Sequence, residues 1–266
     1  MSTSTCLLVE NRNHVLTLTL NQPEKRNALS LEMLEALQLQ LLQSAKGEDI
    51  RVVVIAANGP VFCAGHDLKE LTAHREDADK GKAFYQQIMA LCAKVMQAIV
   101  HHPRPVIAKV QGMATAAGCQ LVASCDLAIC TDTARFCTPG VNIGLFCSTP
   151  MVALSRNLAR KKAMEMLLLG EVIDAQSAQA FGLVNQVVGP NQLDSAVTQY
   201  SDKLCAKSTL VLAIGKEAFY QQIEMPLAQA YDYTSEVMVK NMLHAEAVEG
   251  IGAFIEKRSP HWQQSE

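Results

Sequence analysis

Residues 59–70 read GPVFCAGHDLKE and follow an apolar, β-branched run at residues 51–57. That run predicts a strand buried on both faces, as in a parallel sheet, and a helix is expected to begin near Leu68. Between them, Gly65 permits a backbone turn that other residues rarely adopt. Such a turn would leave the N–H of His66 unpaired and pointing outward, where it can bind an anion.

A second loop has the same design. Residues 110–120 read VQGMATAAGCQ and combine a strand, a run of small residues and the start of a helix. The small side chains let a ligand approach the backbone, and the helix N-terminus adds positive potential. Facing each other, the two loops would form an oxyanion hole, in which one donor is typically worth about 10²–10³ in rate. Ordinary glycine-containing turns between a strand and a helix would give the same pattern.

Strands and helices alternate over the first 150 residues. Leu16, Leu18 and Leu20 alternate with polar residues, as in a half-buried strand, and apolar residues at helical spacing follow Ser30, an expected N-cap. The other predicted elements are a helix over residues 80–99 and strands over 106–110 and 126–130. Strands joined through helices predict right-handed crossovers and stacked layers, and hence an α/β fold.

From about residue 151 onward the sequence is mainly helical and carries two apolar stripes. One stripe consists of Leu227, Tyr231, Thr234 and Met238, and the other of Ala247, Ile251, Phe254 and Ile255. Amphipathic helices at the end of a chain have to bury these faces against the same subunit or a neighbouring one.

Composition restricts the classes of protein and of partner. The 266 residues are 49% hydrophobic and 18% charged, and the formal net charge of −3 predicts neither nucleic-acid nor anionic-membrane binding. Polar or charged residues interrupt every apolar run, so no membrane span is expected. The nine cysteines are scattered without metal-ligand spacing, which predicts reduced thiols and no metal site. The first residues, MSTST, resemble neither a secretory signal nor a transit peptide.

Several motifs, taken in order, resemble those of the crotonase (enoyl-CoA hydratase/isomerase) superfamily. They are NQPEKRNAL at residues 21–29, FCAGHDLKE at 62–70, GCQLV at 118–122 with Cys125-Asp126, and FIEKRSP at 254–260. The resemblance covers almost the whole chain. It implies a right-handed spiral of ββα turns over residues 1–200, which contains an acyl-CoA site, and a C-terminal helical region over 201–266 that drives trimerisation. It also implies a homotrimer or a dimer of trimers, and a role in mitochondrial fatty-acid metabolism.

The same resemblance assigns the two oxyanion donors to the backbone N–H groups of His66 and Ala117. Coenzyme A is implied as part of the substrate, with no tightly bound cofactor. Its groove would be lined by Lys25, Arg26, Ala28, Ala64, His66, Asp67 and Leu68, with Phe254 and Lys257 reaching it from a neighbouring subunit. Lys25 and Arg26 suit the phosphate groups of coenzyme A, although a solvated turn would also place basic residues there.

The sequence departs from the family at the residues that move protons. Hydratases of the family use two glutamates, and the corresponding positions are Gln120 and Gly140. Neither can exchange a proton in the working pH range, whereas one general acid or base is typically worth about 10²–10⁴ in rate. The carboxylate of the isomerase relatives would fall near Cys147 and Ser148, and residues 141–151 contain no Asp or Glu. Restoring both glutamates is expected to restore some hydration.

Other residues near these positions have alternative roles. Cys147 and His66 would form a nucleophilic thiolate–imidazole pair if their side chains met; otherwise His66 packs along the groove. Gln120 and Asn142 would hold a water or polarise the substrate, or simply make structural hydrogen bonds. Asp67 is either a base or the N-cap of the following helix.

Three functions fit the sequence. The first is an acyl-CoA protein whose chemistry needs only carbonyl polarisation, such as thioester hydrolysis or decarboxylation. The second is a catalytically silent acyl-CoA-binding protein with a regulatory or interaction role, which the acid-free stretch at 141–151 favours. The third is residual enoyl-CoA hydratase or isomerase activity. The two donor loops are common to all three and do not distinguish them.

Overall fold

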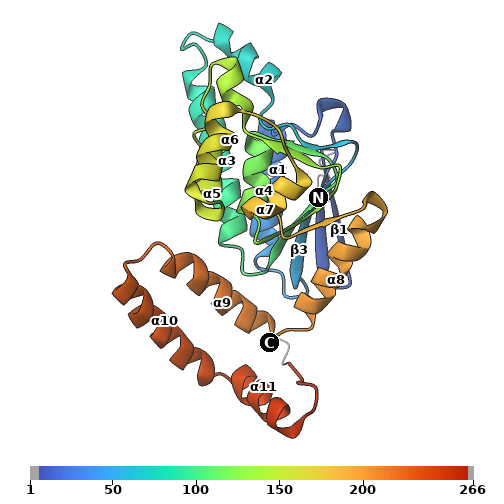
Figure 1. Ribbon diagram of the computed structural model, residues 1–266, viewed down its shortest axis with the longest axis vertical. Helices are drawn as coiled ribbons and strands as arrows, with labels where there is room; N and C mark the ends of the chain where they lie inside the picture. Colours follow the sequence, from blue (N-terminus) through green and yellow to red (C-terminus); the bar gives the residue numbers. More distant parts are fainter. Residues whose placement is uncertain (1–5, 263–266) are drawn as a thin grey trace.

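The computed structural model describes residues 6–262, which form two sheets surrounded by helices (Figure 1). The larger sheet has six strands in the order β1-β2-β3-β5-β7-β10. They span Leu7–Arg12, Val15–Leu20, Val52–Ala57, Val106–Val110, Leu127–Thr131 and Gln186–Val188. β1 and β2 form an antiparallel pair, and all other neighbours are parallel. β3 is buried along nearly its whole length, as the run at 51–57 predicted.

The smaller sheet has the order β4-β6-β8-β9. β4 (Val61–Cys63), β6 (Met113–Thr115) and β8 (Arg135–Cys137) are parallel, and β9 (Ile173–Asp174) is antiparallel to β8. The chain passes through the larger sheet at β3, β5 and β7, and each time crosses next to the smaller sheet at β4, β6 and β8. Because both sheets keep the same order, the passages stack as three ββα turns with right-handed crossovers. The fold is therefore the α/β spiral that the sequence predicted.

Helices fill the connections of the spiral. α1 (Leu31–Ser44) begins where it was expected, because the Ser30 Oγ accepts a hydrogen bond from the Met33 N–H at 3.3 Å. The other helices of the core are α2 (Leu68–Ala73), α3 (Lys82–Val100), α4 (Ala117–Ser124), α5 (Pro150–Asn157), α6 (Arg160–Leu169), α7 (Ala175–Phe181) and α8 (Leu193–Cys205). Short 3-10 turns η1 to η4 span Pro23–Lys25, His74–Glu76, Pro139–Ile143 and Pro190–Gln192.

Helix α3 is the one helix in the described part of the chain that is long and apolar enough to cross a membrane. It packs against α1, and one of its faces is buried. The buried residues are Phe84, Ile88, Cys92, Val95, Met96 and Ile99. Other positions, such as Lys94, are exposed. This amphipathic pattern is typical of a helix that covers a hydrophobic core.

The last three helices form an arm that extends away from the sheets (Figure 1). They are α9 (Thr209–Gln222), α10 (Leu227–Met242) and α11 (Ala245–Glu256). Large apolar side chains of the arm are exposed in this chain, including Leu243 at 81% and Phe254 at 84%. The predicted apolar stripes therefore stay largely uncovered within one subunit. The predicted division at residue 200 falls inside α8, which packs on β3, β5 and β7, so the arm begins at α9.

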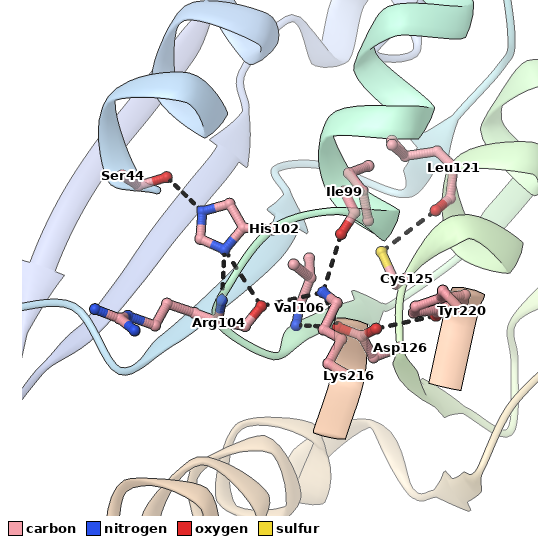
Figure 2. A network of polar contacts seen from close by, with 10 residues as sticks. All are labelled: Ser44, Ile99, His102, Arg104, Val106, Leu121, Cys125, Asp126, Lys216 and Tyr220. Carbon is pink, nitrogen blue, oxygen red and sulfur yellow. Dashed lines mark hydrogen bonds and ion pairs between the residues drawn. The ribbon is translucent and has the colours of Figure 1, made fainter. Parts of the chain in front are cut away.

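A buried ion pair attaches α9 to the core (Figure 2). The Lys216 Nζ lies 2.6 Å from the Asp126 Oδ2 and also donates to the carbonyl oxygens of Ile99 and Arg104, at 3.0 and 3.1 Å. The Tyr220 hydroxyl donates to the Asp126 Oδ1 at 3.0 Å. Burial raises the pKa of Asp126 and lowers that of Lys216, and the attraction between the two charges opposes both shifts.

The imidazole of His102 is buried next to this network (Figure 2). Its Nδ1 accepts a hydrogen bond from the Arg104 N–H at 3.0 Å, and its Nε2 lies 3.0 Å from the Ser44 Oγ. Burial, and next the positive charge of Lys216, lower the pKa of His102 to about 4. The neutral ring is therefore the form that this position stabilises.

We expect the free energy of unfolding to fall as the pH drops from 6.5, the ordinary pKa of histidine, to about 4. Between these values the unfolded chain binds a proton at His102 that the folded chain does not, so stability rises with pH in this window. The loss should be about 2–3 kcal/mol and should be absent from His102→Asn. Urea unfolding at several pH values measures it, and equal pH slopes for the two proteins would contradict it.

Candidate functional site

The loops that follow β4, β6 and β8 lie side by side at one edge of the smaller sheet. The strands are parallel, and Cys63 is paired with Ala114 and Thr115 with Cys137. The carboxyl ends of neighbouring parallel strands meet at the same edge of a sheet. The structure therefore brings together three segments, residues 64–67, 116–120 and 138–140. The first two belong to the loops that the sequence identified as donor loops.

The two donor loops touch at Gly65. A Cβ added to Gly65 would lie 3.0 Å from the Ala116 Cβ, 3.1 Å from the Thr115 oxygen and 3.2 Å from the Ala117 nitrogen. Gly65 also has φ +82°, in the left-handed region that favours glycine. Within residues 6–262, neither the His66 N–H nor the Ala117 N–H donates to a backbone carbonyl. Two unpaired donors on touching loops are suited to bind a carbonyl oxygen that gains negative charge.

Helix α4 begins at Ala117 through a strained turn. Ala116 has φ +51° and ψ −118°, a conformation that costs a non-glycine residue free energy and is found mainly at functional sites. The Ala116 N–H donates to the Cys137 oxygen at 2.9 Å. Gly118 packs so closely on β4 that an added Cβ would lie 2.3 Å from the Cys63 oxygen. These contacts fix the direction of the Ala117 N–H at the positive end of the helix dipole.

The loop at residues 25–29 lies against the first donor loop. The Ala64 N–H donates to the Arg26 oxygen at 3.0 Å, and the Leu29 N–H donates to the Gly65 oxygen at 2.7 Å. The predicted groove residues of this loop are Lys25 and Arg26, which are exposed, and Ala28, which is buried. Two basic side chains therefore stand in solvent beside the donor loops.

The side chains of His66 and Asp67 are both engaged by the protein. The His66 Nδ1–H donates to the Leu29 oxygen at 3.3 Å, and burial lowers the pKa of His66, so the ring is neutral. The Asp67 Oδ1 accepts hydrogen bonds from the N–H groups of Lys69 and Glu70, at 2.9 and 3.2 Å, and caps α2. The sequence allowed Asp67 to be either a base or a helix N-cap, and in the structure it is the N-cap.

The two positions at which the resemblance predicts glutamates differ in their surroundings. Gln120 is only 4% exposed, and its Oε1 has no hydrogen-bond partner among the described residues. At Gly140 the space for a side chain is already taken, because an added Cβ would lie 2.9 Å from the Leu145 oxygen and 3.0 Å from the Cys147 Sγ. Burial raises the pKa of Cys147 and keeps it a thiol. These contacts give no support to a thiolate–imidazole pair between Cys147 and His66.

We expect Gly140→Glu to destabilise the protein and to leave it without hydratase activity, even in combination with Gln120→Glu. The new side chain can enter only if residues 145–147 move, and overpacking of this kind typically costs about 1–3 kcal/mol. The crowding at Gly140 therefore changes the expectation from the sequence that restoring both glutamates would restore some hydration. Adding Cys147→Ala removes one of the two obstacles and gives the matched comparison. Thermal unfolding and hydration of crotonyl-CoA measure both effects, and a double variant that is stable and active would contradict the prediction.

The remaining predicted site residues lie at different distances from the three loops. Leu68 is the exposed first residue of α2. Phe254 lies in α11 and Lys257 directly follows it, in the arm that extends away from the sheets (Figure 1). The Asn142 Nδ2 lies 3.5 Å from the Gly170 oxygen, a structural contact. Across residues 6–262, no three His, Cys, Asp or Glu side chains converge as metal ligands.

Sequence reasoning missed the three short strands that align the loops, and it missed the strain at Ala116. Two glycines in the sequence could have indicated this alignment. A Cβ on Gly112 would lie 2.0 Å from the Pro60 oxygen, and a Cβ on Gly118 would lie 2.3 Å from the Cys63 oxygen. Both glycines mark places where one turn of the spiral packs closely on the next.

Cavities of about 460 and 440 Å³ lie away from the three loops, one beside β10 and the other between the helices of the arm.

Comparisons with known proteins agree with this geometry. A profile described as enoyl-CoA hydratase/isomerase matches residues 10–265. Enoyl-CoA hydratase domain-containing protein 3, mitochondrial, of Rattus norvegicus is 48% identical over 248 residues, which cover 93% of this chain and 81% of the relative. The crystal structure of an enoyl-CoA hydratase from Mycobacterium smegmatis has a TM-score of 0.92 at 49% identity and covers 97% of this chain and 99% of its own. That of human enoyl-CoA hydratase domain-containing protein 3 has a TM-score of 0.92 at 46% identity, with coverage of 97% and 100%. Because the family profile matches nearly the whole length of this chain, the chain belongs to the enoyl-CoA hydratase/isomerase family.

Proposed function

We propose that the protein binds an acyl-CoA thioester and polarises its carbonyl group between the N–H groups of His66 and Ala117. The observation that carries this proposal is the contact of the two donor loops at Gly65, where neither N–H group donates to a backbone carbonyl of residues 6–262. Preorganised donors of this kind stabilise the oxyanion of acyl-transfer chemistry without a side-chain proton. Two reactions can proceed with polarisation of the carbonyl as the only contribution from the protein. In thioester hydrolysis water attacks the carbonyl carbon, the C–S bond breaks, and the protons pass through solvent from water to the thiolate; in decarboxylation CO₂ leaves and the enolate takes a proton from solvent.

A second candidate is an acyl-CoA-binding protein without catalysis, which acts by regulation or interaction. It is favoured by the contacts at Gly140, where Leu145 and Cys147 fill the place of a catalytic side chain. It is also favoured by the lack of any Asp or Glu over residues 141–151. Hydration or isomerisation of enoyl-CoA ranks third, since it requires a general acid or base that these positions do not supply.

Assembly and location belong to the same proposal. The exposed apolar residues of α9 to α11 support a homotrimer, or a dimer of trimers, in which the arm covers a neighbouring subunit. In that assembly Phe254 and Lys257 would complete the coenzyme A groove of the neighbour. The mitochondrial names of the relatives support a role in mitochondrial fatty-acid metabolism.

Calorimetric titration with a non-hydrolysable thioether analogue of an acyl-CoA, in which a methylene group separates the sulfur from a retained carbonyl group, tests the proposal. We expect binding at micromolar concentrations. A turnover screen with crotonyl-CoA and a panel of saturated acyl-CoAs then separates the candidates. Hydrolysis or decarboxylation supports the first function, and binding without turnover supports the second. Failure to bind any coenzyme A ester would overturn both, and robust hydration of crotonyl-CoA would contradict the roles assigned to Gln120 and Gly140.

A further inference from the structure

Two arginines lie close together where the arm joins the core. Arg51 and Arg104 each stand two residues before a member of the pair Val53 and Val106, which joins the neighbouring strands β3 and β5. The Arg104 Nε donates to the oxygen of Ile50, the residue before Arg51, at 2.7 Å. The two side chains therefore come from adjacent segments and meet at the amino ends of these strands.

Each of the two side chains is anchored to the backbone and keeps other donors. The Arg51 Nη1 donates to the Cys205 oxygen at 2.7 Å, as the Arg104 Nε does to the Ile50 oxygen. A guanidinium group carries five N–H donors, and neither side chain binds a further acceptor among residues 6–262. Both residues are partly exposed, and Figure 2 shows the Arg104 side chain turned away from Lys216. Both guanidinium groups therefore have donors left for a ligand.

The positive charge of this pair is not neutralised by the protein. Within the described part of the chain, no carboxylate lies at ion-pair distance from either guanidinium. Asp49, the acid nearest to Arg51 in the sequence, pairs with His14 at 2.8 Å. Cys205 ends α8, and the carboxyl end of a helix supplies only roughly half a negative charge. Burial, and next the charge of Arg51, lower the pKa of Arg104, because two like charges repel each other.

We propose that Arg51 and Arg104 bind a small oxyanion of the phosphate class, with two negative charges, at the amino ends of β3 and β5. Two guanidinium groups match the charge of a dianion, and the planar fork of each presents parallel N–H groups to two oxygens. A tetrahedral anion offers oxygens in more than one plane, so it can serve two forks that come from different strands. Neither arginine belongs to the donor loops or to residues 25–29, so this anion site is independent of the proposed acyl-CoA site.

Calorimetric titration of the full chain with inorganic phosphate tests the site, at fixed ionic strength and about pH 8, where phosphate is mainly a dianion. Sulfate is the second probe. We expect saturable binding of one anion per chain. Arg51→Gln and Arg104→Gln should each weaken it about tenfold or more, the loss typical of a hydrogen bond between charged groups. Arg104→Lys keeps the charge without the fork and should weaken it severalfold. The matched control is Arg160→Gln, the same change at the exposed first residue of α6, which should leave the affinity unchanged.

Each outcome supports or overturns the site. If neither phosphate nor sulfate binds the wild type saturably, the two arginines serve only the backbone and the proposal fails, whether or not the protein binds acyl-CoA. An affinity that is unchanged in both glutamine variants, or that falls in Arg26→Gln instead, would place the anion elsewhere and overturn it as well. If the glutamine variants do not fold, Arg104→Lys decides, because binding as tight as that of the wild type would contradict the role of the fork.

Discussion

Gly65→Ala should weaken acyl-CoA binding at least tenfold and lower any turnover by about 10²–10³, the loss typical of one oxyanion donor. The new methyl group would sit 3.2 Å from the Ala117 nitrogen and 3.0 Å from the Ala116 Cβ, and so would push the two donor loops apart. Alanine also has to adopt φ +82°, at a cost of roughly 1–2 kcal/mol. Titration with the thioether analogue measures binding, and thermal unfolding measures stability.

The backbone cost and the loss of the site can be separated by a second glycine. Gly182 ends α7 with φ +89°, and a Cβ there would meet only the Asn157 oxygen, at an ordinary 3.4 Å. Gly182→Ala should therefore carry the same backbone cost as Gly65→Ala, without its steric overlap, and leave acyl-CoA binding unchanged. If both variants bind alike, the contact at Gly65 does not hold the donors, and the site proposed here is wrong.

Lys216→Met should lower the free energy of unfolding by about 3–5 kcal/mol, as removal of one partner of a buried ion pair typically does. The Lys216 and Asp126 side chains are only 9% and 16% exposed. Without the lysine, Asp126 keeps hydrogen bonds from the Val106 N–H and the Tyr220 hydroxyl but loses its counter-charge. The carbonyl oxygens of Ile99 and Arg104 lose their donor as well. Urea unfolding at one fixed protein concentration measures the change, because the stability of any protein that self-associates depends on its concentration.

An exposed ion pair provides the comparison. Lys162→Met removes a lysine from an ion pair with Glu165, in which the two side chains are 42% and 49% exposed, respectively. This change should lower the free energy of unfolding by less than about 1 kcal/mol. Combining Lys216→Met with Asp126→Asn removes both charges and should recover part of the loss. A Lys216→Met variant as stable as Lys162→Met would show that the ion pair does not attach the arm.

The sequence predicted the larger sheet better than the smaller one. β3 and β5 consist mostly of apolar, β-branched residues, a composition that predicts strands buried on both faces. β4, β6 and β8 have three residues each, too few to show a period of two. Their alignment depends on contacts between successive turns of the spiral, such as Gly112 against Pro60.

The candidate site was predictable to a similar degree. Gly65 and the small residues before Gly118 indicated two donor loops, because close backbone approach needs small side chains. The filling of the space at Gly140 by Cys147, seven residues along the chain, depends on how the loop folds back. The pairing of Lys216 with Asp126 joins residues 90 positions apart, and a lone lysine in a helix gives no sign of its partner.

The two donors of this site are atoms that every amino acid except proline carries. Substitutions at His66 and Ala117 can therefore alter the side chains and leave the donors in place. A side chain that acts as an acid or base is lost with a single substitution, and the positions to which the resemblance assigns the glutamates are Gln120 and Gly140. A site built from backbone donors can accordingly keep its capacity to bind a carbonyl oxygen when the side chains around it change.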